Sequence, residues 1–138
     1  MASFNKFNSF VEALSEKVHN LGSDTLKVML TNTQPAATNA VKSEITEISA
    51  GSGYTSGGAT LSVTSSNQTS GTYKLVVSDV TFTATGSLGP FRYVVMYNDT
   101  ATNKELIGWY DYGSSITLST GETFTIDFDQ TSGVLTLT

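Results

Sequence analysis

The alternation of threonine with large apolar residues limits the fold of this chain more than any other feature of its sequence. Residues 123–128 show it most clearly, because Phe124, Ile126 and Phe128 alternate there with threonine or aspartate. Residues 80–84 repeat the pattern as Val-Thr-Phe-Thr-Ala. Successive side chains of a strand point to opposite faces of a sheet, so a period of two predicts strands with one buried and one exposed face.

Most of the chain follows this pattern. Alternation or a short apolar run predicts strands at 25–30, 73–78, 79–84, 91–97, 105–112, 116–118, 123–128 and 134–138, and a weaker, Ser/Thr-rich strand at 59–66. Residues 98–103 are expected to form a hairpin connection. In the strand at 105–112, we expect Ile107 and Trp109 on one face and Tyr110 and Tyr112 on the other. Short strands separated by turn residues predict a mainly β fold, either an antiparallel β-sandwich or a barrel-like sandwich.

An amphipathic helix is expected before the strands, over about residues 4–20. Apolar side chains recur there three and four positions apart, at Phe4, Phe7, Phe10 or Val11, Leu14, Val18 and Leu21. Ser3 is placed to cap the first turn, and Gly22 suits the left-handed position after the last turn. His19, the chain's single histidine, is expected in the last turn, where partial positive charge favours the helix dipole.

The length of 138 residues fits a single domain over residues 1–138. Within it we expect the β-sandwich to occupy about residues 24–138. Residues 32–58 are polar, contain Pro35 and several glycines, and predict a long excursion with a short strand at 44–48.

Composition excludes several kinds of chemistry. The chain has no cysteine, so it can form no disulfide, thiolate metal site or thiol nucleophile. One histidine leaves little scope for a metal site or an acid–base relay, and a Ser-His-Asp triad would need His19 at a helix end. The Gly-rich residues 51–58 are interpreted as a flexible turn. We therefore expect no enzyme activity, no catalytic residues, and no metal or other cofactor.

Charge and hydropathy narrow the class of partner. The net charge is −5 with seven basic residues, a poor match to nucleic acid. All seven lie at or before Lys104, and five acidic residues follow it. That distribution predicts either a solvated face or an acidic side that complements a basic neighbour. No apolar run approaches the ~20 residues that span a bilayer, and residues 1–10 lack the apolar core of a secretory signal, so no membrane association is expected.

The sequence indicates one candidate site for a small ligand. Trp109, Tyr110 and Tyr112 would suit a sugar-binding platform, with carboxylates at Asp111, Asp127 and Asp129 nearby. The alternative is that these aromatic residues fill and border the core. Asp127 and Asp129 also offer oxygen ligands of the kind calcium takes, but two carboxylates alone are a weak calcium motif, and a solvated strand end is the preferred interpretation.

An ordered series of motifs covers roughly residues 25–138. The series is 26–35 (LKVMLTNTQP), 43–48 (SEITEI), 49–54 (SAGSGY), 80–84 (VTFTA), 89–98 (GPFRYVVMYN), 106–112 (LIGWYDY), 121–128 (GETFTIDF) and 133–137 (GVLTL). Each motif alone consists of ordinary strand and turn residues. Their order resembles a widespread group of small virion proteins of tailed bacteriophages, described as capsid decoration or tail-fibre proteins.

The resemblance implies a structural role in the virion. The group has no catalytic residues that could be assigned to positions of this chain. The expected role is a capsid decoration (cement) protein on the capsid surface of the virion, made in the bacterial host cytoplasm. Its partners would be the major capsid protein or other virion proteins, and it would be a homo-oligomer. The alternatives are a tail tube or tail fibre subunit, and a carbohydrate-binding or receptor-adhesin module.

Contact residues are sought in the N-terminal segment and in the excursion. The candidates for protein contact are Phe4, Phe7, Pro35, Ile45 and Tyr54. Phe4 and Phe7 are also candidate core residues.

Overall fold

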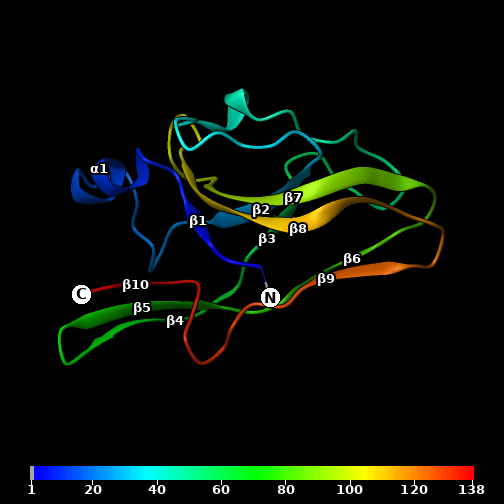
Figure 1. The fold of residues 1–138 in the computed structure, drawn as a ribbon. Helices are drawn as coiled ribbons and strands as arrows, with labels where there is room; N and C mark the ends of the chain where they lie inside the picture. The colour runs from blue at the N-terminus through cyan, green and yellow to red at the C-terminus, as the bar shows by residue number, and fades with distance from the viewer. Residues whose placement is uncertain (1) are drawn as a thin grey trace.

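The computed structural model describes residues 2–138 and consists mainly of antiparallel β-strands (Figure 1). The elements are β1 (Asn5–Lys6), α1 (Phe10–Ser15), β2 (Leu26–Thr31), the 3₁₀ turn η1 (Lys42–Glu44), β3 (Ala59–Thr60), β4 (Val63–Thr69), β5 (Thr72–Val77), β6 (Val80–Thr83), β7 (Leu88–Asn98), β8 (Leu106–Leu118), β9 (Thr123–Ile126) and β10 (Leu135–Leu137). The prediction of a mainly β, antiparallel fold is confirmed. The predicted strands at 105–112 and 116–118 are one continuous strand, β8.

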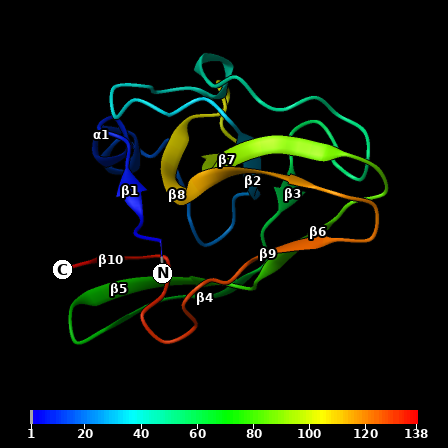
Figure 2. The same ribbon diagram turned by 45° about the vertical axis from the view of Figure 1, so that its right-hand side comes forward.

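The strands form three sheets. A five-stranded sheet has the order β1-β8-β7-β2-β3, a three-stranded sheet has the order β10-β5-β4, and β6 pairs with β9. Figures 1 and 2 show the two smaller sheets lying along one side of the five-stranded sheet. The sheets formed by residues 2–138 remain open, so the barrel-like alternative is wrong.

The main core lies between the large sheet and the two smaller ones. Every sheet contributes buried side chains to it, among them Val28, Leu75, Phe82, Phe91 and Ile126. Burial of one such side chain stabilises the folded state by about 1.5–3 kcal/mol. These contacts therefore hold the five-stranded sheet against the two smaller sheets. The threonines of β6 and β9 point outward, as the alternation predicts.

A second, smaller core covers the outer face of the five-stranded sheet. It contains Phe7, Met29, Val95, Tyr97 and Leu106, with Ile45 and Trp109 packed at its side. Side chains of β7 therefore alternate between the two cores, which explains why this strand is apolar on both faces.

The predicted helix over residues 4–20 is wrong for most of its length. Only Phe10–Ser15 is helical, while Asn5–Lys6 is extended and pairs with β8. Phe4 and Phe7 are three residues apart, a spacing that shares a face in a helix but falls on opposite faces of an extended segment. Accordingly, Phe4 packs against the main core and Phe7 lies in the second core.

The predicted helix ends are also displaced. Ser9 occupies the N-cap position instead of Ser3, and its side chain makes no capping bond. Lys17, with a φ of 69°, takes the left-handed conformation expected of Gly22. His19 follows the helix rather than lying in its last turn, and it is buried.

The excursion over 32–58 folds back on its own chain. Figure 1 shows it crossing above β2 and β7. The strand predicted at 44–48 is replaced by η1 and by an isolated bridge between Thr31 and Glu47. A backbone hydrogen bond from Leu106 N to Ala40 O ties the excursion to the β7–β8 hairpin.

A β-bulge in β8 changes which of its side chains share a face of the sheet. The register shifts so that Met96 faces Gly108 while Tyr97 faces Leu106, which leaves Ile107 as the extra residue. Ile107 therefore joins the main core, on the opposite side from Trp109. Simple alternation had placed both on one face.

Candidate functional site

An apolar hollow of about 450 Å³ opens at the end of the main core, and we call it the aromatic groove. Its lining includes five aromatic residues and two carboxylates: Phe4, Tyr110, Tyr112, Phe124, Phe128, Asp127 and Asp129. These residues come from the N-terminal segment, from β8, and from β9 with the residues that follow it. A concave apolar surface with a few polar groups is the usual form of a ligand or partner site.

The aromatic rings of the groove support one another. Tyr112 lies 5.5 Å from Phe124, and Tyr110 meets Phe128 edge-on at 6.0 Å between ring centroids. Phe4 meets Tyr110 edge-on at 5.7 Å. These are the separations at which aromatic pairs attract. The result is a set of mutually packed rings that line the groove.

Gly108 makes room for Phe4. A Cβ atom at position 108 would lie 2.3 Å from two ring atoms of Phe4 and 2.7 Å from the backbone oxygen of Asn5. Only glycine, which has no side chain, allows β1 and the Phe4 ring to approach β8 this closely.

The groove combines an exposed ring with anionic groups at its edge. Tyr112 is 53% exposed, the largest fraction among the large hydrophobic residues of 2–138. Burial raises the pKa of Tyr110 to about 12, so its hydroxyl stays protonated and can donate a hydrogen bond. Backbone N–H groups of Ser132 and Thr131 lower the pKa of Asp129, which keeps that carboxylate ionised. Chemically, the groove suits a flat apolar or sugar surface that carries hydrogen-bond donors.

The structure separates Trp109 from the two tyrosines. Trp109 lies on the other face of β8, where it packs against Phe7 with 4.6 Å between ring centroids. Asp111 is also outside the groove, because Arg92 binds it through two hydrogen bonds of 2.8 and 3.0 Å. That guanidinium lowers the pKa of Asp111. Of the predicted sugar platform, only Tyr110 and Tyr112, with Asp127 and Asp129, come together.

Most of the predicted contact residues are buried or partly buried in the fold. Phe7 and Pro35 are buried, and Ile45 packs at the side of the second core. Tyr54 is buried in the main core, where its hydroxyl donates to Glu47 and accepts from the backbone N–H of Leu30. Phe4 alone lines the aromatic groove.

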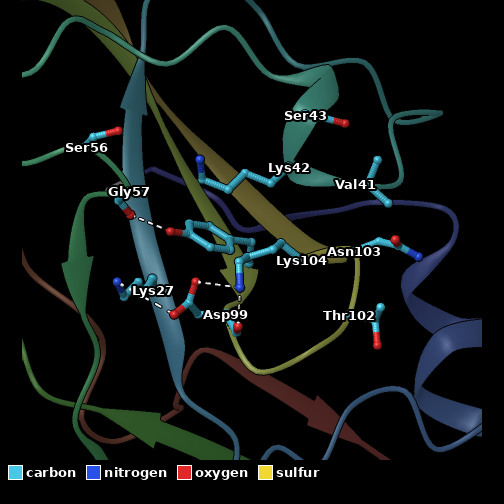
Figure 3. A pocket seen from close by; sticks show the side chains of 11 residues that line it. Lys27, Val41, Lys42, Ser43, Ser56, Gly57, Asp99, Thr102, Asn103 and Lys104 are labelled. Carbon is cyan, nitrogen blue, oxygen red and sulfur yellow. Dashed lines mark hydrogen bonds and ion pairs between the residues drawn. The ribbon is translucent and has the colours of Figure 1, made fainter.

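A second hollow, of about 610 Å³, lies on the outer face of the five-stranded sheet, and we call it the lysine hollow (Figure 3). The charged residues that line it are Lys27, Lys42, Lys104 and Asp99. They lie on β2, on η1 and in the β7–β8 hairpin loop. Its other lining residues are Val41, Ser43, Ser56, Gly57, Tyr97, Thr102 and Asn103.

Sequence analysis did not find the lysine hollow, because its lysines are far apart in the chain. Pairing of β2 with β7 sets Lys27 directly opposite Tyr97, two residues before Asp99. This pairing register is the one signal that places Lys27 near Asp99. Nothing in the local sequence indicates that η1 brings Lys42 to the same place.

Within residues 2–138, no group of histidine and acidic side chains could hold a metal ion, and no helix is long and apolar enough to cross a membrane. Comparisons of the chain with models of protein families, with curated proteins and with solved structures find no match. A functional assignment therefore rests on the residues and geometry of this chain.

Proposed function

We propose that this chain is a structural protein of a tailed-bacteriophage virion, and within it a capsid decoration protein that binds and stabilises the assembled shell. The observation that carries the proposal is the order of motifs over residues 25–138, which resembles small virion proteins of tailed phages. The motifs at 26–35, 80–84, 89–98, 106–112 and 121–128 coincide with β2, β6, β7, β8 and β9. The resemblance thus follows successive strands of a two-layer fold, which we class as an antiparallel β-sandwich.

The aromatic groove is the surface that we assign to the major capsid protein. Interfaces are anchored by a few aromatic side chains in desolvated pockets, and Tyr112 is exposed beside Phe124 in such a position. The apolar floor would receive an apolar side chain of the capsid protein, and Asp127 would face its donors. Many copies on one shell would gain avidity from individually weak contacts.

The free edge of β8 supports self-association. Within residues 2–138, β1 pairs with that edge at Gly108 and Trp109, and backbone bonds with Phe7 and Ala40 cover Ile107 and Leu106, so residues 110–118 of β8 have no strand partner on that side. Unpaired backbone groups on an edge favour pairing with another chain. We propose that copies associate through this edge on the capsid surface.

Fractionation of virions tests the proposal. Virions of the phage that encodes this chain are separated into heads and tails, and the protein is quantified in each fraction by mass spectrometry. A decoration protein is expected with the heads, in a fixed ratio to the major capsid protein. Recovery in tails alone would contradict it and would favour the tail tube or tail fibre alternative.

A carbohydrate-binding module is the second candidate, favoured by the exposed Tyr112 ring beside Phe124 and Asp127. A glycan array probed with the wild type, Tyr112→Ala and Trp109→Ala distinguishes the two aromatic positions. A module built on the groove binds a glycan, loses it in Tyr112→Ala and keeps it in Trp109→Ala. Absence of any glycan binding by the wild type would remove this candidate.

A further inference from the structure

The charges that line the lysine hollow are unbalanced. Three lysines face one carboxylate, that of Asp99, which gives the lining a net charge of +2. The whole chain has seven basic residues and a net charge of −5, so three of its seven cations meet at one place. Figure 3 shows Lys27, Lys42 and Lys104 approaching the hollow from three segments.

The three ammonium groups are held by defined contacts. Asp99 is shared, with Lys104 Nζ at 3.2 Å from Oδ1 and Lys27 Nζ at 3.7 Å from Oδ2. Lys104 Nζ also donates to the backbone oxygen of Asp99 at 2.6 Å. Lys42 Nζ lies 5.7 Å from the centre of the Tyr97 ring, a cation–π distance. Each lysine therefore has a defined contact at the rim or wall of the hollow.

Glu47 forms an ion pair with Lys42, 3.6 Å from its Nζ, and so reduces the excess positive charge around the hollow to +1. It is not among the lining residues, and its side chain is only 14% exposed. Its Oε2 atom accepts hydrogen bonds from the Tyr54 hydroxyl and from the backbone N–H of Gly57. Glu47 is thus occupied in holding the excursion on the sheet.

The remaining polar groups of the wall include hydroxyl and amide donors, of which Ser56 also bonds to Glu47 and Asn103 to Glu105. The hydroxyls of Ser43, Ser56 and Thr102 and the amide of Asn103 line the same space. Lysine ammonium groups act as point charges with rotatable donors and bind carboxylate and phosphate without a fixed bidentate geometry. Hydrogen bonds from charged donors to such oxyanions are among the strongest available at a partly exposed site.

We propose that the lysine hollow binds an oxyanion ligand of the carboxylate or phosphate class. The ligand would lie between Lys42 and Lys104, with its oxygens accepting from ammonium and hydroxyl groups. Nucleic acid does not fit, because a chain of net charge −5 repels an extended polyanion beyond this one patch. The site is independent of the proposed virion role, since it uses the opposite face of the five-stranded sheet from the aromatic groove.

An NMR titration tests the site. The ¹⁵N-labelled chain is titrated at low ionic strength with citrate and, separately, with pyrophosphate, using sodium chloride at matched ionic strength as the reference. Saturable shifts are expected for the amides of Gly57, Asp99 and Lys104. The probe with the lower dissociation constant shows whether the hollow prefers a carboxylate or a phosphate. Shifts no larger than those produced by sodium chloride would overturn the proposal.

Two glycine substitutions provide a matched comparison. Lys104 and Lys17 both have left-handed backbones, with φ of 55° and 69°, and only Lys104 lines the hollow. Glycine accepts this conformation, so Lys104→Gly and Lys17→Gly remove the same charge from similar backbones. Lys104→Gly is expected to weaken probe binding at least about fivefold, and Lys17→Gly by less than about twofold.

A third variant separates a lost charge from a rearranged hairpin. Lys42→Gln acts from η1 and leaves the β7–β8 loop untouched, and it should also weaken binding at least about fivefold. Equal weakening by Lys104→Gly and Lys17→Gly would show that binding follows net charge alone and would overturn the site. So would unchanged binding in Lys42→Gln.

Discussion

At the scale of single residues, Asn98 joins the β7–β8 hairpin to the segment after helix α1. Its side chain is fully buried, and its Oδ1 accepts the backbone N–H groups of Thr100 and Ala101. Its Nδ2 donates to Asp24 at 2.7 Å and to Nδ1 of His19 at 3.0 Å. Because Nδ1 accepts this bond, the neutral His19 ring carries its proton on Nε2. Protonation of Nδ1 would remove this acceptor and break the hydrogen bond from Asn98.

The stability of the protein is therefore expected to depend on the charge of His19. Burial lowers the pKa of His19 below its ordinary value of 6.5, and the Glu105 and Asp24 carboxylates offset only part of the effect. The unfolded chain, with its pKa near 6.5, takes up the proton first as pH falls. Stability is thus complete above pH 6.5 and declines below it, by at most about 1.4 kcal/mol per pH unit.

Urea denaturation at pH 7.5, 6.5 and 5.5 measures this effect, with His19→Gln as the variant that cannot titrate. The wild type should lose unfolding free energy over this range, and His19→Gln should change much less. Glu44, Asp111 and Asp129 do not contribute there, because hydrogen bonds lower their pKa values further below the range. A wild-type midpoint that stays constant between pH 7.5 and 5.5 would disprove the assignment.

At the scale of elements, the close approach of β1 to β8 depends on Gly108. Gly108→Ala puts a Cβ atom into the Phe4 ring and the Asn5 backbone, so β1 must move away from β8. Overpacking of this kind costs about 2 kcal/mol. We expect a lower urea midpoint and faster hydrogen exchange of the amides that join β1 to β8.

The double variant Phe4→Ala, Gly108→Ala identifies the cause. Removal of the ring relieves the contact with Phe4 but not the one with the Asn5 backbone, so the double variant should lose somewhat less stability than the sum of the single variants. Strict additivity would show that Phe4 does not limit the approach.

The strands could be predicted from the sequence and the N-terminal segment could not, because local periodicity identifies a strand but not its pairing partner. A period of two over several residues identifies a strand such as β6 or β9 without knowledge of its partner. Phe4, Phe7 and Phe10 share a helical spacing, but pairing of Asn5 and Lys6 with β8 outweighs it. The bulge at Ile107 likewise depends on the register of two strands. The lysine hollow depends on tertiary convergence, which no local pattern encodes.

At the scale of the whole molecule, two chemically different surfaces lie on opposite faces of the five-stranded sheet. The lysine hollow lies on the outer face, beside the second core, and is cationic. The aromatic groove opens from the main core, and its polar rim is anionic. Asp111 does not extend that rim, because Arg92 neutralises it. The five acidic residues that follow Lys104 therefore do not make one continuous acidic face.

Because the aromatic groove is a separate surface, we expect substitution of Tyr112 to weaken partner binding more than it lowers the stability of the fold. The Tyr112 ring is 53% exposed and packs on Phe124, so Tyr112→Ala should lower the unfolding free energy by only about 1 kcal/mol. Under the proposed decoration role, Tyr112 is an aromatic anchor of the interface and contributes about 2 kcal/mol to binding, so affinity for capsids assembled without this protein should fall more than about tenfold. Val11→Ala is the matched control, since Val11 is 47% exposed on α1, outside the groove. Co-sedimentation with such capsids gives both affinities. Equal losses in the two variants would show that the groove does not contact the capsid, because exposed apolar area alone would then explain the binding.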